Sequence, residues 1–277
     1  MSISYFRRLV DRKEFSLFEA SLLLVKNIVD PDLDLEKWSA EIDTLATYAA
    51  DHISEVHGIE DKILLLADWL FGPDGAGFKG NRRYYGDPRN SFLNEVIDRR
   101  LGIPITLSII FMETAERLGI SLTGVGLPGH FVVGGYVQEG DPPILIDPFN
   151  QGKHLTLDDC SQLISQTTGY RGAFREEWLE PTPPKLILIR VLNNLRIAFM
   201  RQESWQNAIS VFKHLQILQP EQATHYRDEG LIHYHIKQFH QAAILLEKYL
   251  ELEPNPKDID LIKSMVGEKL TDWARLN

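Results

Sequence analysis

The sequence predicts an α+β domain over residues 1–180, followed by an all-α helical array over residues 185–277. Apolar side chains recur at helical spacing through roughly the first 120 residues, and short β-branched or aromatic segments come next. A 34-residue repeat then fills the last third of the chain. Three prolines, at positions 181, 183 and 184, favour a domain boundary between the two parts.

Two amphipathic helices are expected early in the first domain. Between residues 36 and 56, apolar side chains recur every three or four positions, which predicts one helix with a single buried stripe. A second helix, over residues 60–71, should end at the Gly-Pro-Asp-Gly run after Phe71, because glycine and proline both interrupt helices.

Two further helices are expected around residue 100. Asn90 or Ser91 can cap a short helix that ends at Gly102, since a side-chain oxygen there accepts a free backbone N–H. Pro104 suits the first position of the next helix, where the missing N–H would have no partner in any case. Gly119 should close that helix.

Three segments between residues 121 and 149 are predicted to be strands. They are SLTGVGL, HFVVGGYV and PILIDPF, which are short, rich in β-branched or aromatic residues, and separated by proline, glycine and aspartate. We expect them to pair as a meander. Lys153 and His154 should lie in a turn after Gly152, and the following TLDDCSQLISQTT should be helical or irregular.

The repeat in the last third of the chain has a fixed spacing of 34 residues. Four positions recur: Trp205, Ala208, Phe212 and Pro220 match Phe239, Ala242, Leu246 and Pro254. This spacing resembles the tetratricopeptide repeat, in which a small residue lets two antiparallel helices pack closely. In the second unit Tyr226, Gly230 and His233 are predicted to bind a partner, and a closing helix is expected over residues 256–275. Because isolated pairs of repeats bury little surface, the array should lean on the first domain.

Charge and hydropathy narrow the function classes. The net charge of −10 argues against general nucleic-acid binding, although residues 181–277 are nearly neutral, with 12 basic and 11 acidic side chains. The basic stretch over residues 79–100 forms either a solvated face or a site for an acidic partner. No apolar run is long enough to span a membrane and no secretory signal is recognisable, so we expect a cytoplasmic protein.

Neither a cofactor nor a metal site is expected. The single cysteine, Cys160, excludes an intramolecular disulfide and any multi-thiolate metal site. His233 and His235 are two positions apart on a predicted helix and point to different faces, which argues against zinc. The G-x-G-x-x-G run from Gly124 to Gly129 precedes a strand rather than a helix, so it predicts a turn and not a dinucleotide site.

A histidine and a carboxylate mark two neighbouring predicted strands. His130 stands at the head of one strand and Asp147 at the end of the next, 17 residues on. Acyl transfer by a nucleophile commonly uses a residue at a helix N-terminus, a histidine that deprotonates it, and a carboxylate that orients the imidazole. The order of helix, His130 and Asp147 fits that scheme.

Several spaced motifs carry a family resemblance. GIPITLSIIFMETAERLGI, GVGLPGHFVVGGYV and ILIDPF resemble the transglutaminase-like, papain-related core. The longer pattern GN-x2-YYGDPRNSFLNEVIDRRLGIPITLS, with PGHF and DPF, resembles the bacterial SirB-type transglutaminase-like proteins, which also carry a tetratricopeptide tail. The resemblance covers roughly residues 36–275.

The resemblance implies a degenerate catalytic triad. His130 and Asp147 match the histidine and aspartate of the family, but Pro104 stands about where its catalytic cysteine would open the helix. Cys160 lies after Asp147, outside the expected chain order, and its acidic neighbours oppose a thiolate. Thr106 or Ser108 would have to replace the thiol, although such hydroxyls more often bond their own helix backbone.

The leading hypothesis is a non-catalytic, protein-binding or regulatory scaffold whose repeats bind a protein or peptide partner. In that case His130 and Asp147 form a retained structural hydrogen bond, or serve recognition in the former cleft, which Pro104, Asn90 and Glu95 are expected to line. The alternative is a cryptic hydrolase or acyltransferase that uses Ser108 or Thr106 with His130 and Asp147. Direct binding of nucleic acid or membrane is not expected.

Overall fold

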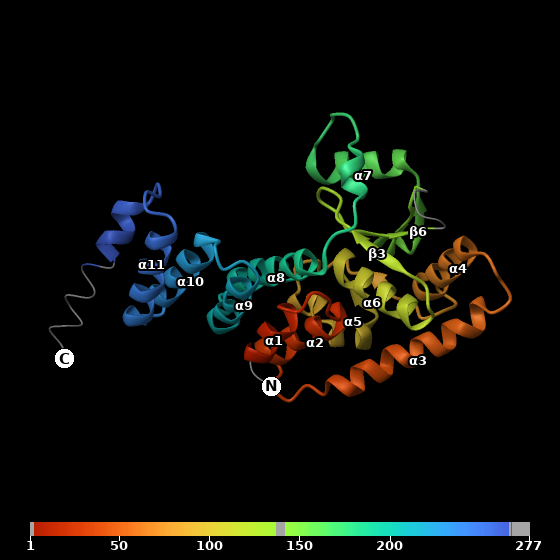
Figure 1. The fold of residues 1–277 in the computed structure, drawn as a ribbon, viewed down its shortest axis with the longest axis horizontal. Coiled ribbons are helices and arrows are strands. Elements are labelled where there is room, and N and C mark those ends of the chain that lie inside the picture. The colour runs from red at the N-terminus through yellow and green to blue at the C-terminus, as the bar shows by residue number, and fades with distance from the viewer. Residues whose placement is uncertain (1–2, 137–141, 266, 268–277) are drawn as a thin grey trace.

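The computed structural model describes residues 3–136, 142–265 and 267. The molecule is elongated: the sheet and most of the helices gather at one end, and the last helices extend away from it to the other (Figure 1). An α+β region is followed by an all-α region, which confirms the predicted fold class.

Six α-helices precede the main sheet: α1 (Ile3–Val10), α2 (Leu17–Ile28), α3 (Leu35–Ile53), α4 (Ile59–Phe71), α5 (Leu93–Arg99) and α6 (Pro104–Arg117). The two helices expected over residues 36–56 and 60–71 are α3 and α4. Asp34 caps α3 by accepting two backbone N–H groups, and α4 ends at Gly72 as the breaker run predicts.

The start and end of α5 differ from the prediction. Asn90 and Ser91 do not cap it: they lie in a 3₁₀ turn, η1 (Pro88–Ser91), which Asp87 caps, and Asn90 is fully buried. The helix also ends earlier than Gly102, because Arg100 takes the left-handed conformation with φ 55°. Gly102 instead lies in a two-residue strand, β2 (Leu101–Gly102), paired in parallel with β1 (Lys79–Gly80).

Helix α6 is the centre of the first region. It begins with Pro104 at the predicted first position, and 11 of its 14 residues are buried. A helix that is apolar on nearly all sides is a core helix rather than an amphipathic one. Gly119, with φ +71°, closes it as expected.

The three predicted strands are present and pair as an antiparallel meander. The sheet has the order β3 (Leu122–Val125), β4 (Val132–Gly135), β5 (Ile144–Asp147) and β6 (Lys153–Leu155). The strand β6 corrects the turn expected at Lys153 and His154, which pair with Asp147 and Ile146. Val137, at the end of the second predicted strand, lies outside the described residues.

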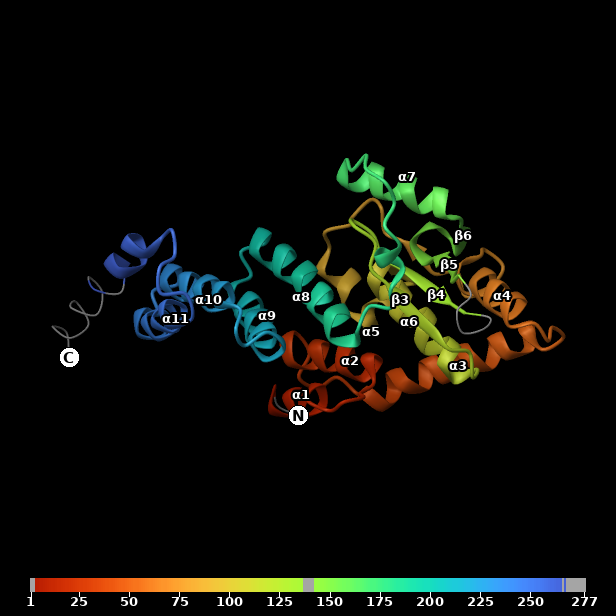
Figure 2. The same cartoon turned by 45° about the horizontal axis from the view of Figure 1, so that its top comes forward.

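Helices cover both faces of this sheet (Figure 2). Val133 and Ile146 point into the main core with α6, whereas Val132 and Leu145 pack with Cys160 of α7 (Leu157–Thr168) in a separate cluster. The segment after β6 is therefore helical, and Thr156 with Asp159 forms a capping box at its start. Because successive side chains of a strand point to opposite faces, the same sheet packs against α6 on one face and α7 on the other.

The helical array consists of α8 (Pro184–Arg201), α9 (Trp205–Leu218), α10 (Ala223–His235) and α11 (Phe239–Leu252). The described part of the expected closing helix runs over residues 259–265, and the rest of its predicted range lies outside the described residues. The main core is continuous from α1 to α10, so the array packs against the first region as expected. Asn27 of α2 and His214 of α9 are hydrogen-bonded across this contact at 3.2 Å.

Candidate functional site

His130 and Asp147 form a buried pair between two strands. Nε2 of His130 lies 2.9 Å from Oδ2 of Asp147, and the two residues are 7% and 0% exposed. The turn Leu127–His130 places the histidine just before β4, and Asp147 ends the adjacent strand β5. The expected hydrogen bond between the strands is therefore present in the structure.

Asp147 has other hydrogen bonds besides that to His130. Its Oδ1 accepts the backbone N–H groups of Phe149 and Asn150, at 3.1 and 3.2 Å, and its Oδ2 accepts the Asn150 amide at 2.5 Å. The carboxylate thus caps the 3₁₀ turn η2 (Pro148–Asn150) as well as orienting the imidazole. A buried carboxylate needs this many donors to be stable away from water.

A cavity of about 220 Å³ lies beside His130, on the side of the α6 N-terminus. Pro104 and Ile105 of α6 form one wall, so Pro104 lies in the same cavity as the histidine, as predicted. The other lining residues are Tyr85, Gly129, Phe131, Arg190, Asn193 and Asn194. Proline carries no group that can attack a carbonyl carbon or exchange a proton with the imidazole.

The hydroxyl groups of Thr106 and Ser108 are buried and hydrogen-bonded elsewhere. The Ser108 hydroxyl donates to the carbonyl of Pro104, four residues earlier, at 2.8 Å. The Thr106 hydroxyl donates to the carbonyl of Asn90 at 2.7 Å and accepts the N–H of Ile103 at 3.2 Å. Among the hydrogen bonds of the described residues, neither hydroxyl is joined to His130, so the geometry gives the alternative nucleophiles no support.

Cys160 lies on the opposite face of the sheet from α6. Its side chain is fully buried in the α7 cluster, and burial, with the nearby carboxylates of Asp159 and Asp147, raises the pKa of Cys160 to about 11. A thiol with a raised pKa is a poor nucleophile, because the thiolate is the reactive form.

Asn90 and Glu95 do not line the cavity beside His130. The Asn90 amide donates to the carbonyls of Tyr84 and Tyr85, and its Oδ1 accepts from Arg99 at 2.7 Å. It therefore holds the loop that carries Tyr85 to the cavity. Glu95 is partly exposed and lies 4.0 Å from Arg99. Asn90 and Glu95 were expected to line the cleft because they lie in the family-like segment NSFLNEV. The cavity is instead lined by residues from segments far apart in the chain.

Arg190 of α8 is a site residue that the sequence did not predict, as are Asn193 and Asn194 on the same helix. It donates to the carbonyl of His130 at 2.8 Å and its guanidinium lies over the Phe131 ring, 5.1 Å from the centroid. It thereby fixes the turn that presents His130, from 60 residues away along the chain. The signal in the sequence was a single arginine inside the otherwise apolar run LILIRVL.

Two of the three residues predicted to bind a partner are unsuited to that role. Gly230 is buried, and a Cβ added there would lie 3.0 Å from Leu246, so the glycine lets α10 and α11 pack closely. His233 is 6% exposed, and its Nδ1 lies 2.6 Å from Oε1 of Gln238. Tyr226 is partly exposed and its hydroxyl donates to the Pro220 carbonyl.

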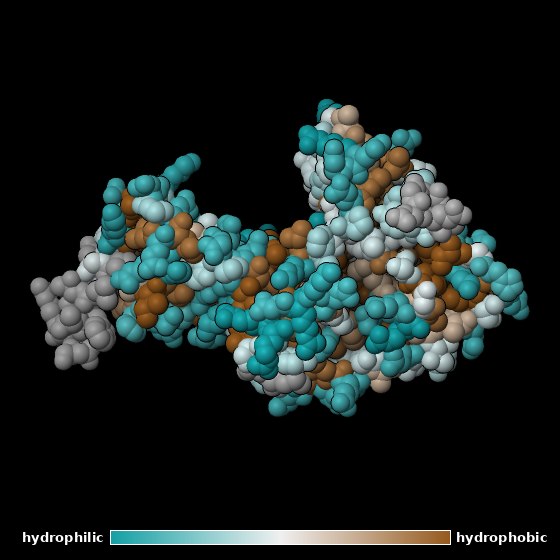
Figure 3. Space-filling view, viewed as in Figure 1, coloured by the Kyte–Doolittle hydropathy of each residue, from teal (hydrophilic) through white to brown (hydrophobic). Residues whose placement is uncertain are grey.

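The exposed apolar groove of the array lies elsewhere, between α8, α9 and α10. It has a volume of about 430 Å³, and its apolar walls include Ile197, Met200, Trp205 and Leu231. Ile197 and Met200 of α8 are 46% and 38% exposed. The surface is mostly hydrophilic on the face seen in Figure 3, with apolar patches over the helical array and the first region.

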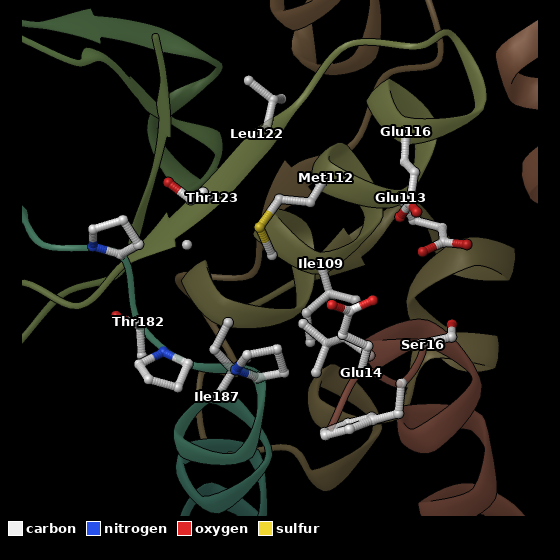
Figure 4. A pocket seen from close by; sticks show the side chains of 16 residues that line it. Glu14, Ser16, Ile109, Met112, Glu113, Glu116, Leu122, Thr123, Thr182 and Ile187 are labelled. Carbon is white, nitrogen blue, oxygen red and sulfur yellow. The ribbon is translucent and has the colours of Figure 1, made fainter. Parts of the chain in front are cut away.

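A second cavity, of about 770 Å³, shares no lining residue with the cavity beside His130. It lies between the loop before α2, one face of α6, the β3 edge and the proline-rich segment 181–184. Figure 4 shows Ile109 and Met112 of α6 in its wall, with the carboxylates of Glu113 and Glu116 to one side. Burial raises the pKa of Glu113, which is paired with Arg117 at 2.9 Å.

The described residues contain neither a cluster of metal-binding side chains nor a helix that could span a membrane. Within residues 3–136, 142–265 and 267, no three histidine, cysteine, aspartate or glutamate side chains are arranged to hold a metal ion. No helix in the same part of the chain is both long and apolar enough to cross a membrane.

Comparison with known families divides the chain into two matched regions. The profile described as the transglutaminase-like superfamily matches residues 36–193, and a tetratricopeptide repeat profile matches residues 195–267. The first match contains His130, Asp147 and Pro104, and it extends into α8 as far as the cavity residue Asn193.

Curated relatives include bacterial proteins that match nearly end to end. A UPF0162 protein of Xylella fastidiosa is 32% identical over 257 residues, which are 92% of this chain and 90% of that protein. The UPF0162 protein of Vibrio cholerae is 29% identical over 93% of each chain. Human F-box only protein 21 is 37% identical over 99 residues, which are 34% of this chain and 16% of that protein.

Proposed function

The chain belongs to the transglutaminase-like superfamily but has proline at the position expected for the nucleophile, and we propose that it is a non-catalytic scaffold that binds a protein partner through its repeats. Tetratricopeptide repeats generally mediate protein–protein interaction, which supports the second half of this proposal. A cytoplasmic location remains the expectation from composition.

The position of Pro104 carries the proposal. The imidazole and carboxylate of the triad are in place, but the cavity in front of them is walled by a pyrrolidine ring. The hydroxyls of Thr106 and Ser108 bond to backbone carbonyls, and the one thiol lies on the other face of the sheet with a raised pKa. Without a side-chain nucleophile, the histidine has no thiol or hydroxyl to deprotonate, so acyl transfer through a covalent intermediate has no first step.

The groove between α8, α9 and α10 is the surface best suited to the partner. Ile197 and Met200 are exposed apolar side chains in this groove. Their burial by a partner would stabilise the complex by roughly 25 cal/mol for each Å² of apolar surface removed from water. Arg196 and Arg201 flank them, and neither forms an ion pair with a described residue. Such a surface complements an amphipathic segment with acidic side chains beside its apolar ones.

Paired surface substitutions test this assignment. Full-length protein should capture its partner from a bacterial lysate, and Ile197→Asp with Met200→Asp should abolish capture by charging the groove. Ile244→Asp is the matched control, because Ile244 is also an apolar residue, 47% exposed, but on α11. Purified partner should then bind the control with wild-type affinity. Equal binding to the groove variant would place the interaction elsewhere and reject the proposed surface.

A further inference from the structure

Arg190 has a positive charge that no carboxylate of the described residues balances. Its guanidinium is in contact with the His130 carbonyl and the Phe131 ring, and it forms no ion pair with a described residue. Burial lowers the pKa of Arg190, which means that the site disfavours the charged form that arginine nevertheless keeps. The Arg190 side chain is half-buried, and a charge that loses part of its hydration is normally paired.

The guanidinium faces a small polar cavity with further donors. Asn193 and Asn194 follow Arg190 by three and four positions on α8, so all three lie on one helix face and line the cavity beside His130. Neither asparagine side chain is hydrogen-bonded to a described residue, and no aspartate or glutamate lines the cavity. The wall is therefore rich in donors and lacks an anion.

We propose that this cavity binds a small carboxylate, held by the guanidinium of Arg190 and the side-chain amides of Asn193 and Asn194. A carboxylate is planar and presents two oxygens, which suits the paired N–H groups of arginine. The site supplies one positive charge, and the Asp147 carboxylate lies directly behind His130, so a monoanion is favoured over a phosphate dianion. A volume of about 220 Å³ limits the ligand to a few heavy atoms or to the end of a chain.

Pro104 is compatible with this ligand. A thiolate at that position would place a second negative charge in the cavity, whereas the pyrrolidine ring is neutral and adds an apolar wall. Pro104 in place of a nucleophile and Arg190 without an ion-pair partner are therefore both consistent with a cavity that binds a carboxylate and does not react with it. The inference goes beyond the partner proposed for the repeats and does not depend on it.

The carboxylate has two possible sources, which separate probes distinguish. Acetate and N-acetylglycine represent free organic acids, and an N-acetylated dipeptide with a free C-terminus represents a peptide end. Its C-terminal amide is the uncharged control, and inorganic phosphate tests for a general anion site. Titration calorimetry on the full chain should give saturable binding of at least one carboxylate probe and none of the amide.

Substitutions on α8 assign the binding to named side chains. Arg190→Met should weaken binding at least about tenfold, since a charge-assisted bidentate contact is lost. Because this change also removes the bond to the His130 carbonyl, Asn194→Leu provides a second variant that leaves Arg190 in place, and it should weaken binding severalfold. Lys185→Met is the matched control, because Lys185 is an exposed basic residue of the same helix that lines neither this cavity nor the groove of the array.

Each outcome bears on the proposal. Binding of free acids, or of the peptide acid alone, supports it and identifies the source. Equal binding of the amide, tighter binding of phosphate than of every carboxylate, no saturable binding of any carboxylate probe, or unchanged affinity in Arg190→Met would overturn it.

Discussion

Nε2 of His130 lies 2.9 Å from Oδ2 of Asp147 in a chain whose α6 begins with proline. The pair is intact although the expected nucleophile is absent, because Asp147 also accepts three hydrogen bonds from Phe149 and Asn150. The carboxylate ties β5 to the turn that follows it and to the turn before β4. A structural role accounts for this pair without catalysis.

Replacement of Asp147 should therefore cost stability. Asp147→Ala leaves four donors without their acceptor in a fully buried site, and we expect a loss of about 3 kcal/mol or more in the free energy of unfolding. Urea unfolding followed by circular dichroism measures it. Asp158→Ala, at an exposed position on α7, should change the midpoint little. A loss below about 1 kcal/mol for Asp147→Ala would contradict the structural role.

The thiol of Cys160 should react slowly with alkylating reagents in the folded protein. Burial raises the pKa of its thiol to about 11, so the thiolate fraction at pH 7.5 is very small. We expect iodoacetamide to label it slowly in buffer and fast in urea, with mass spectrometry as the readout. Stoichiometric labelling of folded protein within minutes at pH 7.5 would show that the thiol is accessible and activated.

His214 should make stability sensitive to mild acid. Its Nδ1 is 2.7 Å from the Ser210 carbonyl and it lies against Phe6, and burial lowers the pKa of His214 to about 4. In the unfolded chain the His214 imidazole takes up a proton near pH 6.5, whereas in the folded chain it stays neutral down to about pH 4. This stabilising contribution is complete above about pH 6.5 and is lost progressively as the pH falls to about 4, for a total of about 3 kcal/mol.

A glutamine at this position separates the titration from packing. His214→Gln should be less stable than wild type at pH 7, and the difference should shrink as the pH falls toward 4, as measured by urea unfolding at several pH values. His52→Gln, at an exposed position on α3, controls for the loss of an imidazole. A constant difference between wild type and His214→Gln across this range would refute the buried neutral form.

Restoring a thiol should restore a nucleophile. In Pro104→Cys the new side chain would stand at the first position of α6, in the cavity that His130 lines. A helix N-terminus and a neighbouring histidine both favour a thiolate, so its labelling by iodoacetamide at pH 7 should be faster than that of Cys160 by at least about tenfold. Adding His130→Ala should slow it. Equal labelling rates with and without His130 would mean that the imidazole does not act on the side chain at position 104.

Local patterns were sufficient to predict most elements. The stripe between residues 36 and 56, the proline at the start of α6 and the short β-branched strands each depend on near neighbours, and α3, α6 and the meander are present as predicted. Strand β6 was missed because Lys153, His154 and Leu155 show no alternation and form a strand only through pairing with β5.

The site was only half predictable. His130, Asp147 and Pro104 lie in motifs that resemble a family, whereas Arg190 reaches the cavity from beyond a proline-rich segment, and no sequence spacing encodes that contact. His233 was predicted to bind a partner, yet it is 6% exposed and its Nδ1 lies 2.6 Å from Oε1 of Gln238 inside the array. Tertiary packing, not local chemistry, decided both positions.

One measurement tests the absence of catalysis most directly. Full-length wild type, His130→Ala and Pro104→Cys are incubated with a glutamine-containing peptide, with and without a primary amine, and both ammonia release and product mass are followed. We expect wild type and His130→Ala to be indistinguishable from buffer. Turnover by wild type that His130→Ala abolishes would contradict it, and would show that this cavity holds a working catalyst despite Pro104.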